Sequence, residues 1–265
     1  MIENPKSAQI KKVAVLQQKK QRLLTGRFIV EGPHAVEEAL RFQPAGVRVI
    51  YTTHAGRSRF ENLDRDADAA GVRIEMVSEQ VLAALSDTVT PQGVVAVVDI
   101  QNPPVAETVT SAKLVAVLID VRDPGNAGAV LRAADAAGAD AVIFAGESID
   151  PWHPKVVRAT TGSLFHLPIS YERDSVQVLD TLTAVGLLTI AADIRGTDLQ
   201  PLDPILSQRT AWIFGNEAHG LKSEERERCD HVRKLPIYGQ AESLNLATAA
   251  AVCLYTSAFQ QQAGA

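Results

Sequence analysis

Residues 118–140 have the sequence Leu118-Ile-Asp-Val-Arg-Asp-Pro-Gly-Asn-Ala-Gly-Ala-Val-Leu-Arg-Ala-Ala-Asp-Ala-Ala-Gly-Ala-Asp140. The stretch opens at the end of an apolar run, 114–119, which is typical of a buried strand. Asp123, Pro124 and Gly125 predict a turn. Asn126 is a good helix N-cap, and Gly138 is a good helix stop. A strand, a turn and a helix in this order predict one unit of an α/β sheet.

Arg132 is the one cation of the small-residue helix expected at 127–137. Long side chains on a helix lean toward its N-terminus, so Arg132 should pass over Gly128. This would aim the guanidinium at the strand-end crevice where open α/β sheets bind ligands. The alternative is an exposed pair with Asp135, which is worth roughly a few tenths of a kcal/mol. The segment by itself leaves both interpretations open.

The composition of the 265 residues, with 46% hydrophobic and 22% charged, is that of a folded globular protein. No apolar run is long enough to span a membrane, and the N-terminus lacks the apolar core of a secretory signal. Cys229 and Cys253 are isolated in the sequence. We therefore expect no metal site, no disulfide framework and a reduced cytoplasmic setting.

The net charge of −5 hides an uneven distribution. Residues 1–27 contain seven Lys or Arg and one acid, giving +6, so the remainder carries −11. A basic arm on an acidic body indicates an anionic polymer as partner. A solvated helix face would have the same composition, and charge alone does not separate the two.

Strands alternate with helices along the whole chain, which predicts largely parallel α/β structure. The expected strands are 28–30, 47–51, 73–77, 93–100, 114–119, 141–145, 187–192, 211–214 and 232–235. The expected helices are 8–24, 35–41, 57–70, 78–85, 127–137, 154–161, 175–185, 223–229 and 246–261. The first of these helices should bury a thin apolar stripe of Ile10, Val13, Leu16 and Leu24. Pro103, Pro104 and the Thr/Ser-rich residues after them mark a linker. The predicted domains are 1–105 and 113–265, with the linker at 106–112.

Two more polar loops follow expected strands of the second half, at 214–221 and 235–246. Since parallel strands end at the same edge of a sheet, all three loops should converge on one site. The loop at Gly215 departs from a nucleotide-binding P-loop, because Lys222 comes one residue too late after Gly220. The sequence also lacks the glycine fingerprint of a dinucleotide site and the elbow of a serine hydrolase.

Simpler explanations exist for the polar residues of these loops. Ser243 and Asn245 precede a helix and could be caps, and Glu217 could be a solvated acid. His153 is a lone histidine of the kind that is most often structural. Arg158 fits a surface position and a phosphate contact equally well. Capping, however, does not explain why three Gly-bearing polar loops all follow strands.

Three stretches resemble, in order and spacing, motifs 1, 2 and 3 of the SpoU (TrmH-like) branch of the SPOUT RNA methyltransferases: Asn126-Ala-Gly128-Ala-Val-Leu-Arg132, Phe214-Gly215-Asn-Glu217-Ala-His-Gly220-Leu221 and Leu235-Pro-Ile-x-Gly239-x-x-x-Ser243-Leu-Asn245-Leu246. Residues 28–40 resemble the substrate-binding domain that precedes the catalytic domain in many members. The subgroup that it resembles most is that of the ribosomal RNA ribose methyltransferases, which includes thiostrepton-resistance enzymes.

The resemblance implies a SPOUT α/β domain with a deep trefoil knot, in which the segment from Leu235 onward passes through a loop and binds S-adenosylmethionine. It implies cofactor contacts at Gly215, Leu235, Ile237, Leu244, Ala192 and Asn245. It also implies a homodimer, for which the alanines of the last helix (Ala247, Ala249, Ala250, Ala251) would permit close packing.

For the reaction, the resemblance implies that Arg132 activates or orients a ribose 2′-hydroxyl. Asn126, Glu217, Ser243 and Asn245 would shape the site around it. Arginine is a poor base because its pKa lies above about 12, so positioning and charge stabilisation are the roles that we expect. The expected RNA contacts are Arg158, Lys19, Lys20, Arg22 and Arg27. Two alternatives remain at this point, a transfer RNA substrate and a non-catalytic RNA-binding module.

Overall fold

The computed structural model describes residues 1–60 and 62–263. Contacts divide the chain into two compact units, each with its own sheet. The first consists of Met1–Ile100 together with Trp152–His166, and the second of Gln101–Pro151 together with the chain from Leu167 onward. Among the described residues, every helix is too short or too polar to cross a bilayer.

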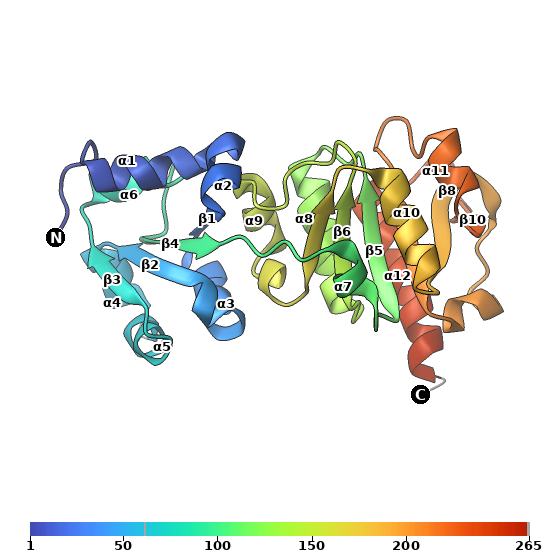
Figure 1. Ribbon diagram of the computed structural model, residues 1–265, viewed down its shortest axis with the longest axis horizontal. Helices are drawn as coiled ribbons and strands as arrows, with labels where there is room; N and C mark the ends of the chain where they lie inside the picture. The colour runs from blue at the N-terminus through green and yellow to red at the C-terminus, as the bar shows by residue number, and fades with distance from the viewer. Residues whose placement is uncertain (61, 264–265) are drawn as a thin grey trace. The chain divides into compact units, whose positions relative to one another are not determined.

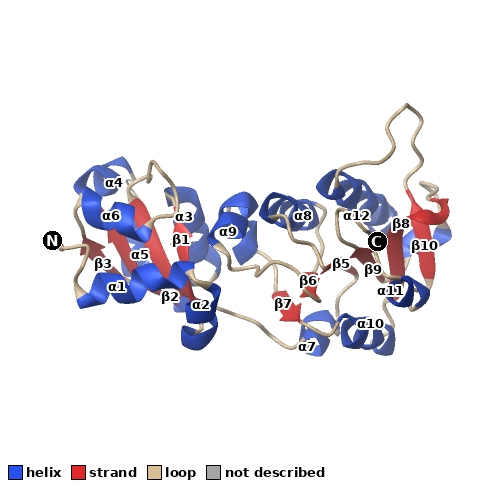
Figure 2. Cartoon of the chain, turned by 90° about the horizontal axis from the view of Figure 1, so that it is seen from above, coloured by secondary structure: helices blue, strands red, loops and turns tan. Residues whose placement is uncertain are grey.

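The first unit is built on a four-stranded sheet of order β1-β4-β2-β3 (Figures 1 and 2). Its strands are β1 Arg27–Glu31, β2 Val47–Thr52, β3 Arg73–Met76 and β4 Val94–Asp99. β4 is antiparallel to β1 and β2, whereas β2 and β3 are parallel. Its helices are α1 Ala8–Ala14, α2 Lys19–Thr25, α3 Pro33–Phe42, α4 His54–Arg59, α5 Leu63–Ala69, α6 Glu79–Leu85 and α9 Pro154–Thr160.

The second unit is a six-stranded sheet of order β10-β8-β9-β5-β6-β7, and all its pairings are parallel. The strands are β5 Leu114–Ile119, β6 Ala141–Ala145, β7 Ile169–Glu172, β8 Leu188–Asp198, β9 Thr210–Phe214 and β10 His231–Lys234. Figure 2 shows α8 (Pro124–Ala136) and α12 (Leu246–Ala263) on one face and α7 (Val105–Val109), α10 (Ser175–Ala184) and α11 (Ser223–Glu227) on the other. The predicted α/β class, with a parallel sheet after a small α/β unit, is confirmed.

The order of the strands reverses direction between β5 and β9. After β5 the chain moves outward through β6 and β7, then crosses to β8 and returns to β9 on the other side of β5. Ligands of open parallel sheets bind at such a switch point, beyond the carboxyl ends of the strands. The loops that follow β5, β9 and β10 are the three loops that the sequence singles out.

Several elements differ from the sequence predictions. The helix expected at 57–70 is two helices, α4 and α5, and the strand β7 was not predicted. The stretch expected as a linker contains α7, whose Val105 and Val109 belong to the core of the second unit. The N-cap of α8 is Asp123, not Asn126: its side chain accepts from the N–H of Asn126 at 2.7 Å. Pro124 then occupies the first helical turn, where a missing N–H is harmless, so the expected turn is the start of the helix.

The helix expected at 8–24 is broken at Gln18, whose backbone is extended (φ −90°, ψ 129°). Ile10, Val13 and Leu16 are buried as predicted, but the break rotates the following residues, and Leu24 is 69% exposed. Arg22 takes the inward position instead and is fully buried. Its guanidinium donates to the carbonyl oxygens of Leu16 at 2.9 Å and Gln17 at 2.7 Å. The prediction that Arg22 contacts RNA is therefore wrong, because the side chain closes the end of the preceding helix.

Replacing Arg22 with Ala should lower the free energy of unfolding by about 2 kcal/mol, because it leaves two helix-end carbonyls without their donor. Chemical denaturation followed by circular dichroism measures the change. Lys20→Ala is the matched control, since Lys20 is exposed on the same helix and its removal should change the free energy by less than about 0.5 kcal/mol. Equal stability of the two variants would contradict the structural role of Arg22.

Candidate functional site

A cavity of about 1110 Å³ lies in the second unit, beyond the carboxyl ends of its strands. Its walls come from the end of β8, the loop 215–222 after β9, the loop 235–245 after β10 and the first turns of α12. Nine residues that the sequence analysis selected line it: Asn126, Ala192, Gly215, Glu217, Leu235, Ile237, Ser243, Leu244 and Asn245. The remaining candidate of this unit, Arg132, is exposed on α8 and is not among the lining residues.

Gly215 lets the loop after β9 fold back on itself. A Cβ at this position would lie 2.4 Å from the backbone carbon of Gly220, far inside van der Waals contact. Asn216 and Gly220 exchange backbone hydrogen bonds of 3.2 and 2.8 Å across the neck of the loop. Gly220 has a left-handed backbone (φ 67°), which glycine adopts without strain. The two glycines therefore make a narrow loop that presents residues 216–219 to the cavity.

Glu217 binds the loop that precedes α8. Its Oε1 accepts from the Asp123 N–H and from Asn126 Nδ2, both at 3.2 Å, and its Oε2 accepts from the Arg122 N–H at 3.4 Å. The N–H of the N-cap residue Asp123 has no partner within α8, so a carboxylate beside it is favourable. Glu217 is exposed, and these three hydrogen bonds tie it to the start of α8 and to the two residues before it.

Asn245 connects the third loop to the first turn of α8. Its Nδ2 donates to Asn126 Oδ1 at 2.9 Å, and its Oδ1 accepts from the Ala247 N–H at 2.9 Å. The capping explanation of Asn245 is thus confirmed for its oxygen, while its nitrogen contacts Asn126. The result is a chain of side chains, Glu217–Asn126–Asn245, that joins the loops after β9 and β10 to the first turn of α8.

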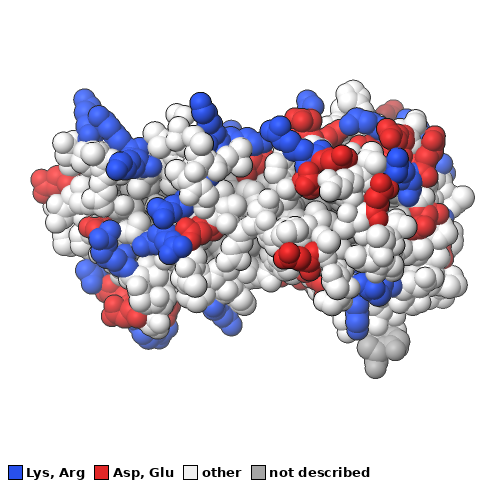
Figure 3. Space-filling view, in the orientation of Figure 1, with Lys and Arg blue, Asp and Glu red and all other residues white. Residues whose placement is uncertain are grey.

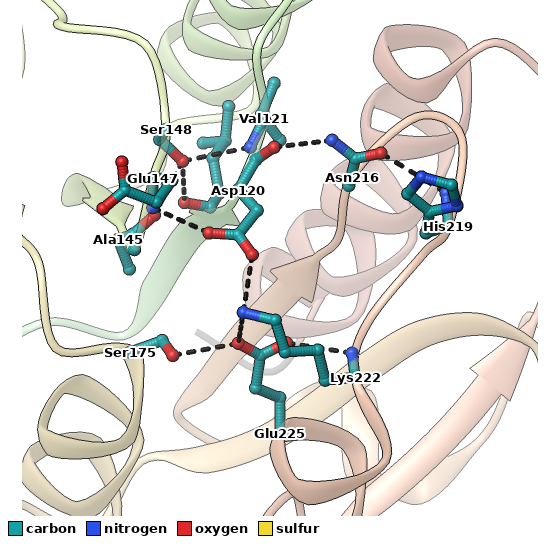
Figure 4. A network of polar contacts seen from close by, with 12 residues as sticks. Asp120, Val121, Ala145, Glu147, Ser148, Ser175, Asn216, His219, Lys222 and Glu225 are labelled. Carbon is teal, nitrogen blue, oxygen red and sulfur yellow. Dashed lines mark hydrogen bonds and ion pairs between the residues drawn. The ribbon is translucent and has the colours of Figure 1, made fainter.

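An ion pair joins the residue after β5 to the end of the loop 215–222 (Figure 4). Lys222 Nζ is 2.8 Å from Asp120 Oδ2, and Asp120 Oδ1 accepts from the Glu147 N–H at 2.7 Å. Burial acts to raise the pKa of Asp120, but these two bonds together with the charges of Lys222 and Arg122 outweigh it and lower the pKa below its ordinary value. The hydrogen bond to Asp120 raises the pKa of Lys222 above its ordinary value.

The two pKa shifts define the pH range of the ion pair. The lowered pKa of Asp120 stabilises the fold above the ordinary carboxyl pKa of 3.8, and this stabilisation is lost as the pH falls through the lowered value. The raised pKa of Lys222 stabilises the fold below the ordinary amine pKa of 10.5, and this is lost as the pH rises through the raised value. The pair is therefore charged at every pH between these ordinary values.

Asp120 and Asn216 were not predicted as site residues. Lys222 was noted only because it lies one residue too far along the chain for a P-loop. Asp193 and Arg195 at the end of β8, which line the cavity, were not predicted either. Asp193 is nearly buried, and its Oδ1 accepts from the Arg195 N–H at 2.9 Å. The available signal was an acidic residue directly after each of two apolar strands, Asp120 after 114–119 and Asp193 after 187–192.

The cations predicted to contact RNA belong to the first unit. Arg158 lies 2.7 Å from Asp87 Oδ2 and 3.8 Å from Glu31 Oε2, and Arg27 lies 3.3 Å from Asp99. Lys20 is exposed and Lys19 is partly exposed. Among the described residues, no group of three or more His, Cys, Asp and Glu side chains could hold a metal ion.

Comparison with known families gives two matches. Residues 113–255 match the model of the SpoU rRNA Methylase family, and residues 7–96 match that of the MRM3-like substrate binding domain. The chain is 36% identical to the 23S rRNA (guanosine(2553)-2'-O)-methyltransferase RlmP of Bacillus subtilis, over 96% of this chain and 97% of the relative. It is 30% identical to the 23S rRNA (uridine(2479)-2'-O)-methyltransferase of Streptomyces viridochromogenes, over 95% of this chain and 89% of that protein.

Solved structures resemble both units together. An AdoMet-bound rRNA methyltransferase from Sinorhizobium meliloti has a TM-score of 0.85 at 28% identity, covering 97% of this chain and 96% of its own. The SpoU methyltransferase AviRb from Streptomyces viridochromogenes, in complex with the cofactor AdoMet, has a TM-score of 0.83 at 29% identity, covering 97% and 100%. The similarity is therefore one of complete architecture.

Replacing Gly215 with Ala should lower the free energy of unfolding by about 2 kcal/mol, because the new methyl group overlaps the backbone of Gly220. Gly239→Ala is the matched control: it lies in the third loop and has no atom within 4 Å of an added Cβ. We expect it to stay within about 0.5 kcal/mol of the parent protein. Urea denaturation of the three proteins tests this, and a Gly215→Ala variant as stable as Gly239→Ala would refute the close approach.

Proposed function

Because the chain belongs to the SpoU rRNA Methylase family, we propose that it transfers a methyl group from S-adenosylmethionine to a ribose 2′-hydroxyl of 23S ribosomal RNA. The observation that carries the proposal is the Glu217–Asn126–Asn245 chain, which joins the three motifs around one cavity. The relatives that act on 23S rRNA match both units, which favours ribosomal over transfer RNA. We also propose a cytoplasmic setting, where such a substrate is found.

The cavity fits S-adenosylmethionine in size and in the character of its walls. Sites for ligands of this class occupy about 300–1,000 Å³, and this one has about 1110 Å³. Both apolar and charged side chains line it, which suits a nucleoside with an amino-acid tail. In our proposal Gly215, Leu235, Ile237 and Leu244 contact the cofactor through their backbone, and Ala192 and Asn245 complete the pocket. The knot that the resemblance implies for the segment after Leu235 stays a prediction.

The bound cofactor would supply a methyl group on a positively charged sulfur. This chain's residues must align the 2′-hydroxyl with that methyl and accept the negative charge that develops on oxygen. We assign this task to the Arg132 guanidinium, which orients the hydroxyl and an RNA phosphate. Asn126, Glu217, Ser243 and Asn245 would hold the nucleotide and fix the start of the Arg132 helix.

A second copy of the chain would complete the site. α12 exposes Val252, Tyr255 and Phe259, which are spaced by three and four residues and so share one face. The Tyr255 hydroxyl donates to the Ala136 carbonyl at 3.0 Å, so this face adjoins the helix that carries Arg132. We therefore propose a homodimer through this face. The larger side chains would form the interface rather than the alanines of α12, since Ala250 is buried in its own unit.

The first unit would hold the RNA. Figure 3 shows Lys and Arg side chains gathered along α1 and α2, where Lys11, Lys12 and Lys20 are exposed. The match of residues 7–96 with a substrate binding domain supports this assignment. Lys20 is an exposed predicted contact and follows the partly exposed Lys19, whereas Arg27 and Arg158 must exchange a carboxylate for a phosphate.

The purified protein should bind S-adenosylmethionine in calorimetry and methylate 23S rRNA in vitro. Arg132→Ala should lower the rate of methyl transfer by roughly a hundredfold or more, because the developing charge loses its partner. Its affinity for the cofactor should stay within twofold, since Arg132 does not line the cavity. Arg173→Ala, which removes an exposed arginine of the same unit, is the control. Unchanged turnover of Arg132→Ala would reject the assignment.

Replacing Lys19 and Lys20 together with Ala should weaken RNA binding and reduce the slope of log K against log salt by roughly 1 for each lost phosphate contact. Filter binding at several salt concentrations measures both quantities. The control replaces Lys113 and Arg173, two exposed cations of the second unit, with Ala. If both double variants change the slope equally, the N-terminal cations have no special role in holding RNA.

A further inference from the structure

Asp120 contacts both ends of the loop 215–222. At the start of the loop, Asn216 Nδ2 donates to the Asp120 carbonyl oxygen at 2.8 Å. At its end, Lys222 Nζ donates to Asp120 Oδ2 at 2.8 Å. Figure 4 shows Asp120 between the two, at the end of the β5 strand. One residue of the first motif region therefore closes a loop that belongs to the second.

Asp120 adopts a left-handed backbone conformation, which Asp tolerates better than most residues with a Cβ. Its φ is +57°, and within the described chain it shares such a value only with Thr161 among residues other than glycine. This conformation is disfavoured for residues with a Cβ, so it persists where surrounding contacts impose it. Here the Glu147 N–H fixes Oδ1, and Gly146 leaves room for it, since a Cβ there would lie 2.3 Å from Oδ1. The strained turn aims the second carboxylate oxygen at Lys222.

Lys222 is held in place from its other side. Glu225, which is nearly buried, accepts from the Lys222 N–H at 2.9 Å through Oε2, and its Oε1 lies 3.5 Å from Lys222 Nζ. The Ser175 hydroxyl donates to the same Oε1 at 2.9 Å. The ammonium group thus bridges two carboxylates that are each anchored elsewhere in the unit, although the lysine side chain itself is 68% exposed.

Glu217 lies between the two held ends of the loop. Its carboxylate reaches Asn126 and the N-terminal turn of α8 only if the loop keeps its present position. We propose that Asp120 and Lys222 are positioning residues, which clamp the loop 215–222 at both ends and thereby fix the Glu217 carboxylate for cofactor binding and methyl transfer. The proposal rests on the function proposed above for the same cavity.

Lys222→Met tests the clamp, because it removes the charge while it keeps the length and the apolar part of an exposed side chain. We expect S-adenosylmethionine to bind roughly tenfold more weakly and kcat/KM for methyl transfer to fall by a similar factor, as is usual when a contact residue is displaced. Amide hydrogens of residues 216–221 should exchange faster in hydrogen–deuterium exchange. Lys222→Arg, which can still pair with Asp120, should restore all three properties, and Asp120→Asn should reproduce the loss.

Arg228→Met is the matched control, because Arg228 forms an ion pair of the same length, 2.8 Å, with Asp180 on the same unit. It should leave cofactor affinity and loop exchange as they are. The clamp is refuted if Lys222→Met behaves like Arg228→Met, or if Lys222→Arg loses as much as Lys222→Met. A parent protein that does not bind the cofactor would refute the proposed function instead, and the exchange of the loop amides would still decide whether the clamp exists.

Discussion

The geometry of the site depends on the hydrogen bonds that the Glu217 carboxylate accepts. This carboxylate satisfies N–H groups at the start of α8 and simultaneously holds Asn126, which in turn holds Asn245. Glu217 and Asn245 come from the loops after β9 and β10, and Asn126 comes from the first turn of α8, which follows β5. A carboxylate at a helix N-terminus is favourable in itself. The same contact therefore stabilises α8 and brings together residues that line the cavity.

The loop that carries Glu217 is possible only because its backbone approaches itself closely. Gly215 meets Gly220 where no side chain fits, and Gly196 in β8 meets the backbone of Val232 and Arg233 in the same way. These contacts lie where the chain segments of the cavity wall pass one another. Charged side chains from β8, β10 and the loops share the cavity wall with this closely packed backbone.

Local sequence patterns predicted the strands other than β7 and the edge of the sheet at which the three loops meet, because apolar runs and the parallel arrangement determine both. Long-range contacts decided what those patterns missed. The predicted first helix is broken at Gln18, and Arg22 then donates to the carbonyl oxygens of Leu16 and Gln17. The apolar periodicity of the sequence does not reveal this break. Residues 152–166 lie between strands of the second unit in sequence, yet they pack with the first. The N-cap is Asp123 rather than the predicted Asn126, because proline is favourable in the first helical turn. The same proline also favours a turn, which is the structure that the sequence predicted there.

Charge is the feature for which sequence and structure diverge most. Five cations are predicted to contact RNA, four from the basic N-terminal segment and Arg158 from the family resemblance. Arg22 is buried on carbonyl oxygens, and Arg27 and Arg158 already face carboxylates. An arginine with a planar, weakly hydrated guanidinium is the residue that folds inward or pairs most readily, whereas lysine keeps its strongly hydrated ammonium in water. The exposed lysines of α1 and α2 are therefore the cations that we propose as contacts to a phosphate backbone. Binding through them would supply affinity that depends on salt, and the choice of the nucleotide would fall to the shape of the second unit's cavity.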